Sequence, residues 1–257
     1  MIPGLTSPDG ITWTRRISGT GNTLNAVGYG NGVFVTVRDY GTILEARTST
    51  ILSRLSFYNQ SAFDGYDASA NAADDGAIAT DKSALLPGGT ATFANYTSYS
   101  RGINGIMVDL SFVPGILSAS DFTFTVGNDN NPAAWATTPA PSSITVLAGA
   151  GVGGSDRVTL IWPNNAIQKQ WLEVTVLANA NTGLKSPDVF YFGNALGECT
   201  GNESVSVQDV GKTKLAAGSA ATITSLYDYN RDGSVSVVDV AKARENAGFA
   251  LPMITAP

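Results

Sequence analysis

The 257-residue sequence contains no histidine, a single cysteine and few charged residues, which make up 14% of the chain. Without histidine, the chain has no Ser-His-Asp or Cys-His nucleophile, no histidine-ligated zinc and no haem held by histidine. A lone Cys199 forms neither an internal disulfide nor a CxxC metal site. The remaining ligands are carboxylate, amide, hydroxyl and carbonyl oxygens, which suit hard cations such as calcium.

Positive charge is also scarce. The 15 lysines and arginines stand against 21 acidic residues, so the net charge is −6. A broad cationic surface for a phosphate backbone is therefore absent, and nucleic acid is a poor partner.

Long hydrophobic runs are missing too. No run reaches the roughly 18 residues of a membrane helix, so we expect no membrane span. The start, Met1 to Gly4, lacks the charged and apolar regions of a signal peptide. Low lysine content, 28 glycines and many Ser, Thr and Asn residues are nevertheless typical of secreted proteins. We expect an extracellular or cell-surface protein whose residue 1 is not the start of the full gene product. A cytoplasmic location is the alternative.

Residues 1–51 predict short strands broken by glycine turns, with apolar alternation over residues 32–38 and 42–46. The string Ser7-Pro8-Asp9-Gly10-Ile11-Thr12-Trp13 resembles the S-x-D-G-x-x-W repeat of sialidase-type β-propellers, and residues 28–35 continue that pattern. A propeller needs about four or more blades, and the sequence has one copy. This lone β-repeat segment must bury its apolar face on the next domain, on a missing upstream region or on another subunit.

Residues 52–196 predict a β-sandwich domain of jelly-roll or immunoglobulin-like type. Strand-like runs occur over residues 105–113, 122–126, 143–147, 157–162, 171–177 and 189–192, separated by Gly, Pro and Asn turns. Several runs alternate polar and apolar residues, as strands do when one face lies on a core and the other in water. The fold class is therefore mainly β.

Residues 197–248 carry an internal repeat. The stretches 205–210 and 235–240 are near copies, and each is followed by a helix-compatible run, residues 211–217 and 241–247. A duplicated loop and helix is the natural interpretation. Residues 249–257 are short and proline-punctuated, and we expect an extended tail.

The second copy has the spacing of a calcium loop. Oxygen-bearing side chains occupy loop positions 1, 3, 5, 9 and 12, with glycine at position 6, and the loop ligands are Asp228, Asn230, Asp232, Ser234 through its carbonyl, Ser236 and Asp239. Alternate side chains point inward, the glycine permits a sharp turn, and the last carboxylate closes the shell of six to eight oxygens. An Asx-rich turn that caps a helix without metal is the alternative.

Asp at position 12, followed by a Val-x-x-Ala-Arg helix, resembles a type I dockerin repeat, and the resemblance covers residues 198–248. It implies two calcium loops and their helices in a pseudo-twofold module that binds a β-sandwich cohesin domain outside the cell. The first loop departs from the pattern because it has Glu203 where glycine belongs. Its candidate ligands are Glu198, Thr200, Asn202, Ser204 and Asp209. This loop either binds calcium in an altered way or keeps only the fold.

An acidic segment lies upstream, in residues 63–81, with Lys82 as the one nearby cation in the sequence. Carboxylates so close together repel one another without a counter-ion. We predict a further calcium site with candidate ligands Asp64, Asp67, Asp74 and Asp75. The alternative is a solvated acidic loop in which Asp caps a short helix over residues 71–79. Strings such as residues 57–65 and 189–195 also resemble the C-terminal regions of large secreted bacterial proteins.

The sequence has no nucleophile motif, phosphate loop or cofactor fingerprint, so we expect no enzyme. Glu45 and Glu173 lie in strand-like runs, where an outward-facing, solvated carboxylate is the ordinary explanation. Our first hypothesis is a calcium-binding structural protein that self-assembles head to tail into a filament or tube, through the dockerin-like end and the N-terminal β-segment. The alternatives are an anchor for a cohesin-like receptor, and a carbohydrate-binding module that uses Trp135 for stacking.

Overall fold

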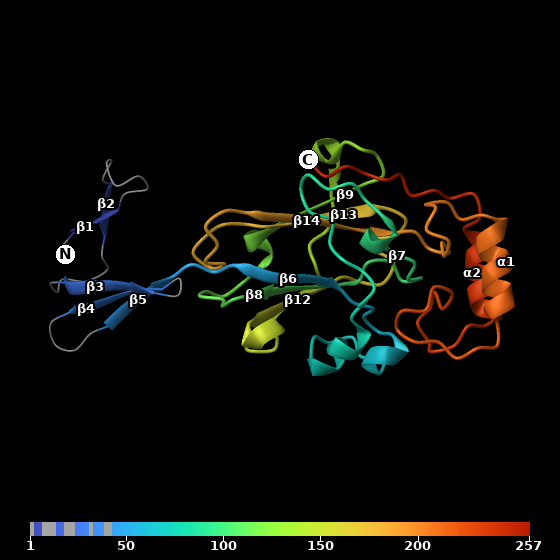
Figure 1. Cartoon of the computed structure of the whole chain (residues 1–257), viewed down its shortest axis with the longest axis horizontal. Coiled ribbons are helices and arrows are strands. Elements are labelled where there is room, and N and C mark those ends of the chain that lie inside the picture. Colours follow the sequence, from blue (N-terminus) through green and yellow to red (C-terminus); the bar gives the residue numbers. More distant parts are fainter. Residues whose placement is uncertain (1–2, 7–13, 18–23, 31–32, 39–42) are drawn as a thin grey trace. The chain divides into compact units, whose positions relative to one another are not determined.

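The structure is a computed structural model that describes residues 3–6, 14–17, 24–30, 33–38 and 43–257. Its contacts divide the chain into two compact units, residues 1–48 and residues 49–257. Both units are built mainly of strands, which confirms the prediction of a mainly β chain (Figure 1). The propeller-like string of residues 7–13 lies outside the described residues.

The described residues of the first unit form five short strands. They are β1 (Pro3–Thr6), β2 (Thr14–Ile17), β3 (Leu24–Gly30), β4 (Val33–Arg38) and β5 (Ile43–Arg47). β1 pairs antiparallel with β2, and β3, β4 and β5 form an antiparallel meander. The alternation expected over residues 32–38 and 42–46 thus corresponds to β4 and β5.

The second unit contains two larger sheets. One has the strand order β11-β12-β8-β6, formed by β6 (Ile51–Ser56), β8 (Gly105–Leu110), β11 (Ser143–Leu147) and β12 (Asp156–Ile161). The other has the order β10-β9-β13-β14-β7, formed by β7 (Tyr96–Thr97), β9 (Phe122–Gly127), β10 (Ala136–Thr137), β13 (Trp171–Val176) and β14 (Asp188–Asn194). Every pairing in these sheets is antiparallel except that of β14 with β7, which is parallel.

One hydrophobic core joins these two sheets. Val108 on β8 and Leu160 on β12 belong to the same buried cluster as Phe124 on β9, Val174 on β13 and Phe190 on β14. Each such side chain contributes about 1.5–3 kcal/mol when it is fully buried. Residues that alternate with them therefore point to the opposite faces of the sheets.

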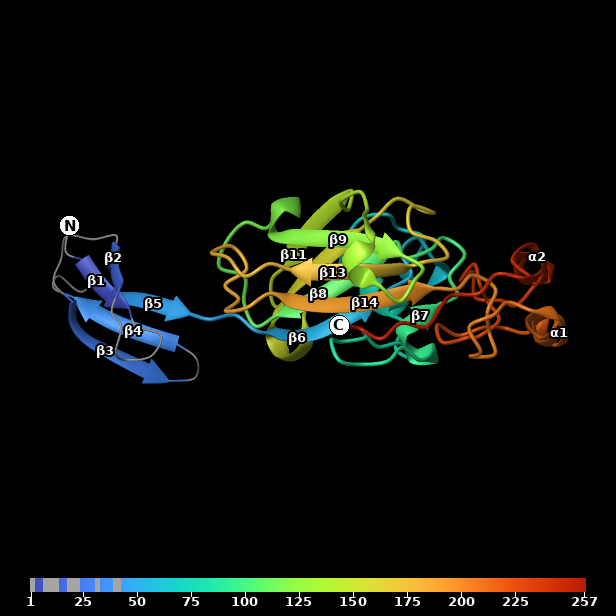
Figure 2. The ribbon, with the colours of Figure 1, turned by 90° about the horizontal axis from the view of Figure 1, so that it is seen from above.

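The outer face of the five-stranded sheet is covered by other segments of the same unit. Trp171 and Tyr191 on this face form a second cluster with Leu85, Leu251 and Ile254. The indole Nε1 of Trp171 donates a hydrogen bond to the carbonyl of Pro252, at 2.7 Å. The tail expected over residues 249–257 is thus fixed across the sheet, and Figure 2 shows it running beside β14.

Two α-helices, α1 (Val207–Ala216) and α2 (Val237–Glu245), lie side by side at one end of this unit (Figures 1 and 2). Both begin four residues before the helix-compatible runs seen in the sequence, because Ser206 and Ser236 cap them. The described 3-10 turns are Ala62–Asp64, Ala72–Ala77, Phe93–Asn95, Ala119–Asp121, Pro132–Ala134 and Val152–Gly154. In the part of the chain that the structure describes, no helix is long and apolar enough to cross a bilayer.

Candidate metal centre

The loop of residues 228–239 is closed at its start by the buried carboxylate of Asp228. One oxygen of Asp228 accepts a hydrogen bond from the amide of Gly233 at 3.0 Å, and the other accepts from the amide of Asp232 at 3.3 Å. Gly233 has φ of +89°, a conformation that glycine adopts without strain. The glycine expected at position 6 therefore makes the sharp turn that folds the loop back onto Asp228.

The same loop is closed at its end by Asp239, in the first turn of α2. One oxygen of Asp239 accepts from the amide of Tyr229 at 2.8 Å, and the other accepts from the amide of Ser236 at 2.8 Å and from its hydroxyl at 3.1 Å. The hydroxyl of Ser236 in turn accepts from the amide of Val238. This capping box fixes the last carboxylate of the loop against the first residues of the loop.

Asp232 lies between these two ends. It accepts hydrogen bonds from the side-chain amide of Asn230 at 2.8 Å and from the hydroxyl of Ser234 at 2.8 Å. Burial opposes ionisation of Asp232, but these hydrogen bonds outweigh it and lower its pKa. Burial raises the pKa of Asp228 to about 6 against the pull of Arg231, and the neighbouring Asp239 and Asp232 charges add to the rise. A cation placed here would relieve that repulsion.

The oxygen donors of this loop match calcium in type and number. Three carboxylates, one side-chain amide, hydroxyls and the Ser234 carbonyl are within a single loop, and calcium takes six to eight such oxygens. Among the described residues, however, no group of three or more His, Cys, Asp or Glu side chains is close enough together to hold a metal. Calcium binding would therefore require the carboxylates of Asp228, Asp232 and Asp239 to move closer together.

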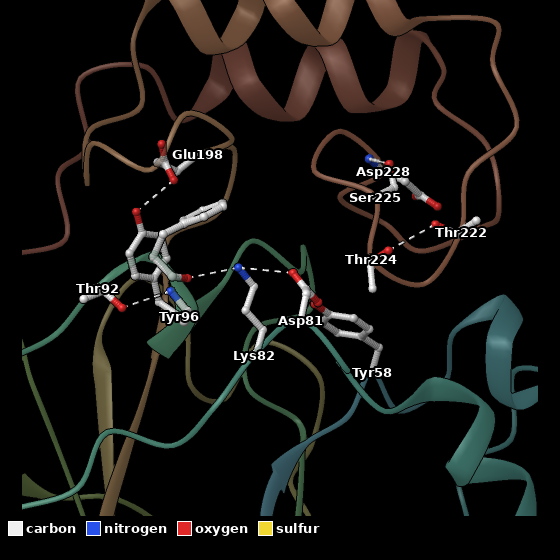
Figure 3. A network of polar contacts seen from close by, with 12 residues as sticks. Tyr58, Asp81, Lys82, Thr92, Tyr96, Glu198, Thr222, Thr224, Ser225 and Asp228 are labelled. Atoms are coloured by element: carbon white, nitrogen blue, oxygen red, sulfur yellow. Dashed lines mark hydrogen bonds and ion pairs between the residues drawn. The ribbon is translucent and has the colours of Figure 1, made fainter.

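The first loop, residues 198–209, has the same plan with different contacts. One oxygen of Glu198 accepts from the amides of Thr200 and Gly201, both at 2.7 Å, from the amide of Asn202 at 3.3 Å and from the hydroxyl of Thr200 at 2.8 Å. Its other oxygen accepts from the hydroxyl of Tyr96 at 2.9 Å, a contact that Figure 3 shows. Protein donors thus satisfy the carboxylate that opens this loop.

The remainder of the first loop repeats the second loop closely. Asp209 accepts from the amide of Cys199 at 2.9 Å and from the amide of Ser206 at 2.8 Å, as Asp239 does from Tyr229 and Ser236. Glu203 has φ of +69° at the position of Gly233, a conformation that costs a residue with a side chain energy. Asn202 accepts from the amide of Ser204 at 3.2 Å, so these candidate ligands bond to the loop itself.

The two loops exchange backbone partners. The amide of Val205 donates to the carbonyl of Phe249, after α2, and the amide of Val235 donates to the carbonyl of Ser219, after α1. The reverse bonds run from Gly248 to Val205 and from Gly218 to Val235. Each loop is therefore held by the segment that follows the other helix, as an approximate twofold axis requires.

Both loops contact the rest of the unit through side chains that no sequence pattern indicated, Arg231 for the second loop and Tyr96 for the first. Arg231, at loop position 4, is 2% exposed. Its guanidinium donates to the carbonyls of Ser225 and Asp228 and to the hydroxyl of Tyr58, and it lies 4.4 Å from the centre of the Tyr58 ring. In Figure 3 the loop segments carrying Glu198 and Asp228 lie between the helices and the segments that carry Tyr96 and Tyr58. Arg231 and Tyr96 contact partners that are far away in the sequence, so no local sequence signal identifies either residue.

The acidic segment forms two separate arrangements. Asp64 accepts from the amides of Gln60 and Tyr66, and Asp74 accepts from the amide of Asn71, which caps the turn Ala72–Ala77. Asp67 accepts from the side-chain amide of Asn71. One oxygen of Asp74 is buried without a partner. Burial, together with the charges of Asp64, Asp67 and Asp75, raises the Asp74 pKa to about 6.

Asp75 does not join the other three carboxylates. It forms an ion pair with Arg157 of β12, which also binds the buried Asp109 at 2.8 Å. Lys82 pairs with Asp81 at 3.4 Å (Figure 3). It also donates a hydrogen bond to the carbonyl of Phe93. Arg157 is thus a second cation for this segment, one that is far away in the sequence. The helix expected over residues 71–79 is the shorter 3-10 turn.

The remaining candidates lie on the outer face of the five-stranded sheet. Trp135 is 8% exposed, and its Nε1 donates to the carboxylate of Asp129 at 3.0 Å, so it offers no open stacking platform. Glu173 was expected to be solvated, but it is half-buried and lines a pocket with Trp135 and Tyr191.

Comparison with known proteins gives no relative: no protein-family model matches the chain, and no curated protein or solved structure matches it either.

Proposed function

We propose that this chain is a non-catalytic, calcium-binding structural protein of the cell exterior, which self-assembles head to tail into a filament or tube through its C-terminal helix pair and its N-terminal β-segment. In this proposal the two sheets of residues 52–196 are a β-sandwich, and residues 197–248 are a dockerin-like module. The exchanged backbone pairing of two loops and two helices supports the module, because a duplicated loop-helix unit is what the dockerin resemblance implies.

Exposed apolar side chains on the helices carry the proposal. Val207 on α1 and Val237 on α2 occupy equivalent positions and are 83% and 79% exposed, while Leu215 is 89% and Val238 46% exposed. Highly exposed apolar side chains can be covered by a protein partner. Their equivalent placement suits a partner that contacts both helices.

Calcium is proposed for the second loop. Bound there, calcium would neutralise the carboxylates of Asp228, Asp232 and Asp239. Asp239 lies in the first turn of α2. A loop that is ordered by calcium would therefore also fix the position of that helix. Glu198 is already satisfied by Tyr96 and by its own loop, which favours one calcium ion in the module over two.

We also propose that the chain is not an enzyme. Glycoside hydrolysis needs two carboxyl groups that flank one bond. Glu173 is the one acidic residue that lines the pocket on the outer face of the sheet, so that pocket does not supply such a pair. Trp135 is largely buried, and this gives no support to the carbohydrate-binding alternative.

The test is the size of the purified protein by light scattering and negative-stain microscopy, in millimolar calcium and then with a chelator. We expect polymers in calcium that disperse on chelation. The double variant Val207→Asp with Val237→Asp should remain monomeric while it binds calcium normally. Lys212→Ser, on the exposed surface of α1, is the matched control and should assemble.

Monomers in both conditions would overturn self-assembly. They would turn the proposal toward the tethering alternative, in which the same helix pair binds a separate cohesin-like receptor. Assembly that is unaffected by the two aspartate substitutions would place the contact elsewhere on the chain.

A further inference from the structure

A pocket of about 350 Å³ opens on the outer face of the five-stranded sheet. Its volume falls within the range of about 300–1,000 Å³ typical of small-ligand sites. The residues that define its chemistry are Thr125, Glu173 and Tyr191 from the sheet, together with Trp135, Pro87 and Pro132. It is separate from the loops of residues 198–209 and 228–239 and from the exposed valines of the helices.

A row of three polar side chains lies along the sheet at this pocket. Thr125 of β9 is paired with Glu173 of β13, and Glu173 is paired with Tyr191 of β14. Because Leu172 and Val174 point into the core, the alternation of β13 directs Glu173 to the outer face. The hydroxyl of Thr125 is buried without a hydrogen-bond partner. A ligand that entered the pocket would meet a carboxylate, a phenol and a free hydroxyl side by side.

Aromatic rings and prolines form the walls. The rings of Trp135 and Tyr191 meet edge to face, with centroids 6.0 Å apart. Trp135 lies directly over the backbone of Gly127, where an added Cβ would come within 2.2 Å of the indole. Its Nε1 is held by the carbonyl and the carboxylate of Asp129. These contacts fix the wall before any ligand binds, which lowers the entropy cost of binding.

The charge of the pocket selects the ligand. Glu173 forms no ion pair with any of the residues that the structure describes. Burial and a hydrogen bond with Glu173 raise the pKa of Tyr191, so its phenol remains a donor to that carboxylate. An unpaired carboxylate in a pocket favours a cation through its charge. Apolar walls favour an aliphatic stem behind that cation.

We propose that this pocket binds an ammonium or guanidinium group on an aliphatic chain, as in a lysine or arginine side chain of a partner polypeptide. The carboxylate of Glu173 receives the cation, and Trp135 and the prolines contact the stem. The inference is independent of the proposed assembly, because it involves neither helix.

The test is titration with N-acetyl-lysine methylamide and N-acetyl-arginine methylamide, followed by tryptophan fluorescence and calorimetry. We expect saturable binding of at least one of them, with a dissociation constant of about 1 mM. The uncharged N-acetyl-norleucine methylamide should bind at least about tenfold more weakly, since a charge-assisted hydrogen bond is lost.

Glu173→Gln keeps the shape of the side chain and should weaken binding about tenfold or more. Glu245→Gln, on the exposed surface of α2, is the matched control and should bind as the unaltered protein does. An unchanged melting temperature of Glu173→Gln would establish that the variant is folded. Gly127→Ala, which displaces the Trp135 wall, should also weaken binding.

The proposal is overturned if norleucine binds as well as lysine and arginine, if Glu173→Gln binds normally, or if none of the three ligands binds. Saturable binding of a neutral oligosaccharide that competes with them would reassign the pocket to sugar recognition.

Discussion

Glu198 and Asp228 open equivalent loops but differ by one methylene group. The longer side chain of Glu198 reaches Tyr96 on β7 and accepts four further hydrogen bonds from its own loop. Asp228 accepts two backbone hydrogen bonds and is left beside the charges of Asp232 and Asp239. The carboxylate that opens the first loop is thus satisfied by the protein, whereas Asp228 lies beside like charges, which supports our proposal of a cation in the second loop.

Calcium stoichiometry tests this difference. We expect the protein to bind one calcium ion tightly in the C-terminal module, measured by calorimetry. The double variant Asp228→Ala with Asp232→Ala should lose that ion and loosen residues 198–248, while the sheets remain folded. Glu198→Gln, the matched change in the first loop, should retain it. Unchanged stoichiometry in the double variant would contradict the loop assignment.

The pH dependence of stability without calcium is set in part by two buried carboxyl groups. The pKa values of Asp74 and Asp228 are raised from 3.8 to about 6. When the pH lies between the unfolded and the folded pKa, the folded state holds more protons than the unfolded state. The free energy of unfolding therefore falls as pH rises from about 4 to about 6.5. Denaturant titrations in chelator should show this loss.

The variants Asp74→Asn and Asp228→Asn should each flatten that pH dependence, because they remove one titrating group. Calcium should cancel the part that belongs to Asp228. Stability that rises over this pH range in chelator would contradict the assignment of both groups.

At the scale of elements, local patterns predict the strands well. The run over residues 143–147 coincides with β11, and the runs over residues 122–126 and 171–177 differ from β9 and β13 by one residue, because alternation reports directly which face is buried. The helix starts were placed too late, since a capping serine was treated as part of the loop. Arg231 and Tyr96 were not foreseeable, because their partners lie far away in the sequence and only tertiary packing brings them together.

The capping serines give a prediction for the helices. Ser236→Ala removes the hydrogen bond to the amide of Val238 and the donor to Asp239, and should cost about 1 kcal/mol. It should also weaken calcium binding, because Asp239 loses a bond that orients it. Ser206→Ala should cost a similar free energy and leave calcium affinity unchanged. Thermal unfolding in chelator and calcium titration measure the two effects.

At the scale of the whole molecule, residues 49–257 form one compact unit although they combine two sheets and a helix pair. The amides of Ala62 and Ser100 donate to the carbonyls of Arg231 and Tyr229 at 2.9 and 2.7 Å, and Arg231 also binds Tyr58. These bonds join the loop of residues 228–239 to the segments next to the sheets. We therefore expect this unit to unfold in a single cooperative transition.

Arg231→Met tests that coupling. The substitution leaves the carbonyls of Ser225 and Asp228 without their charged donor, at a cost of about 1.5–3 kcal/mol for each hydrogen bond. Calorimetry should then resolve a separate, earlier transition for residues 198–248. Arg244→Met, an exposed arginine on α2, should keep the single transition. A single transition in Arg231→Met would show that other contacts carry the coupling.

The exchanged pairing of the two loops means that neither copy of the repeat can be closed without the other. Val205 finds its backbone partners at residues 248 and 249, and Val235 finds its partners at residues 218 and 219, so a single loop and helix leaves its own loop unclosed. Loss of either copy would remove the support of the other. Both copies are therefore needed to close the two loops, although the copies differ in sequence at Glu198 and Asp228 and at Glu203 and Gly233.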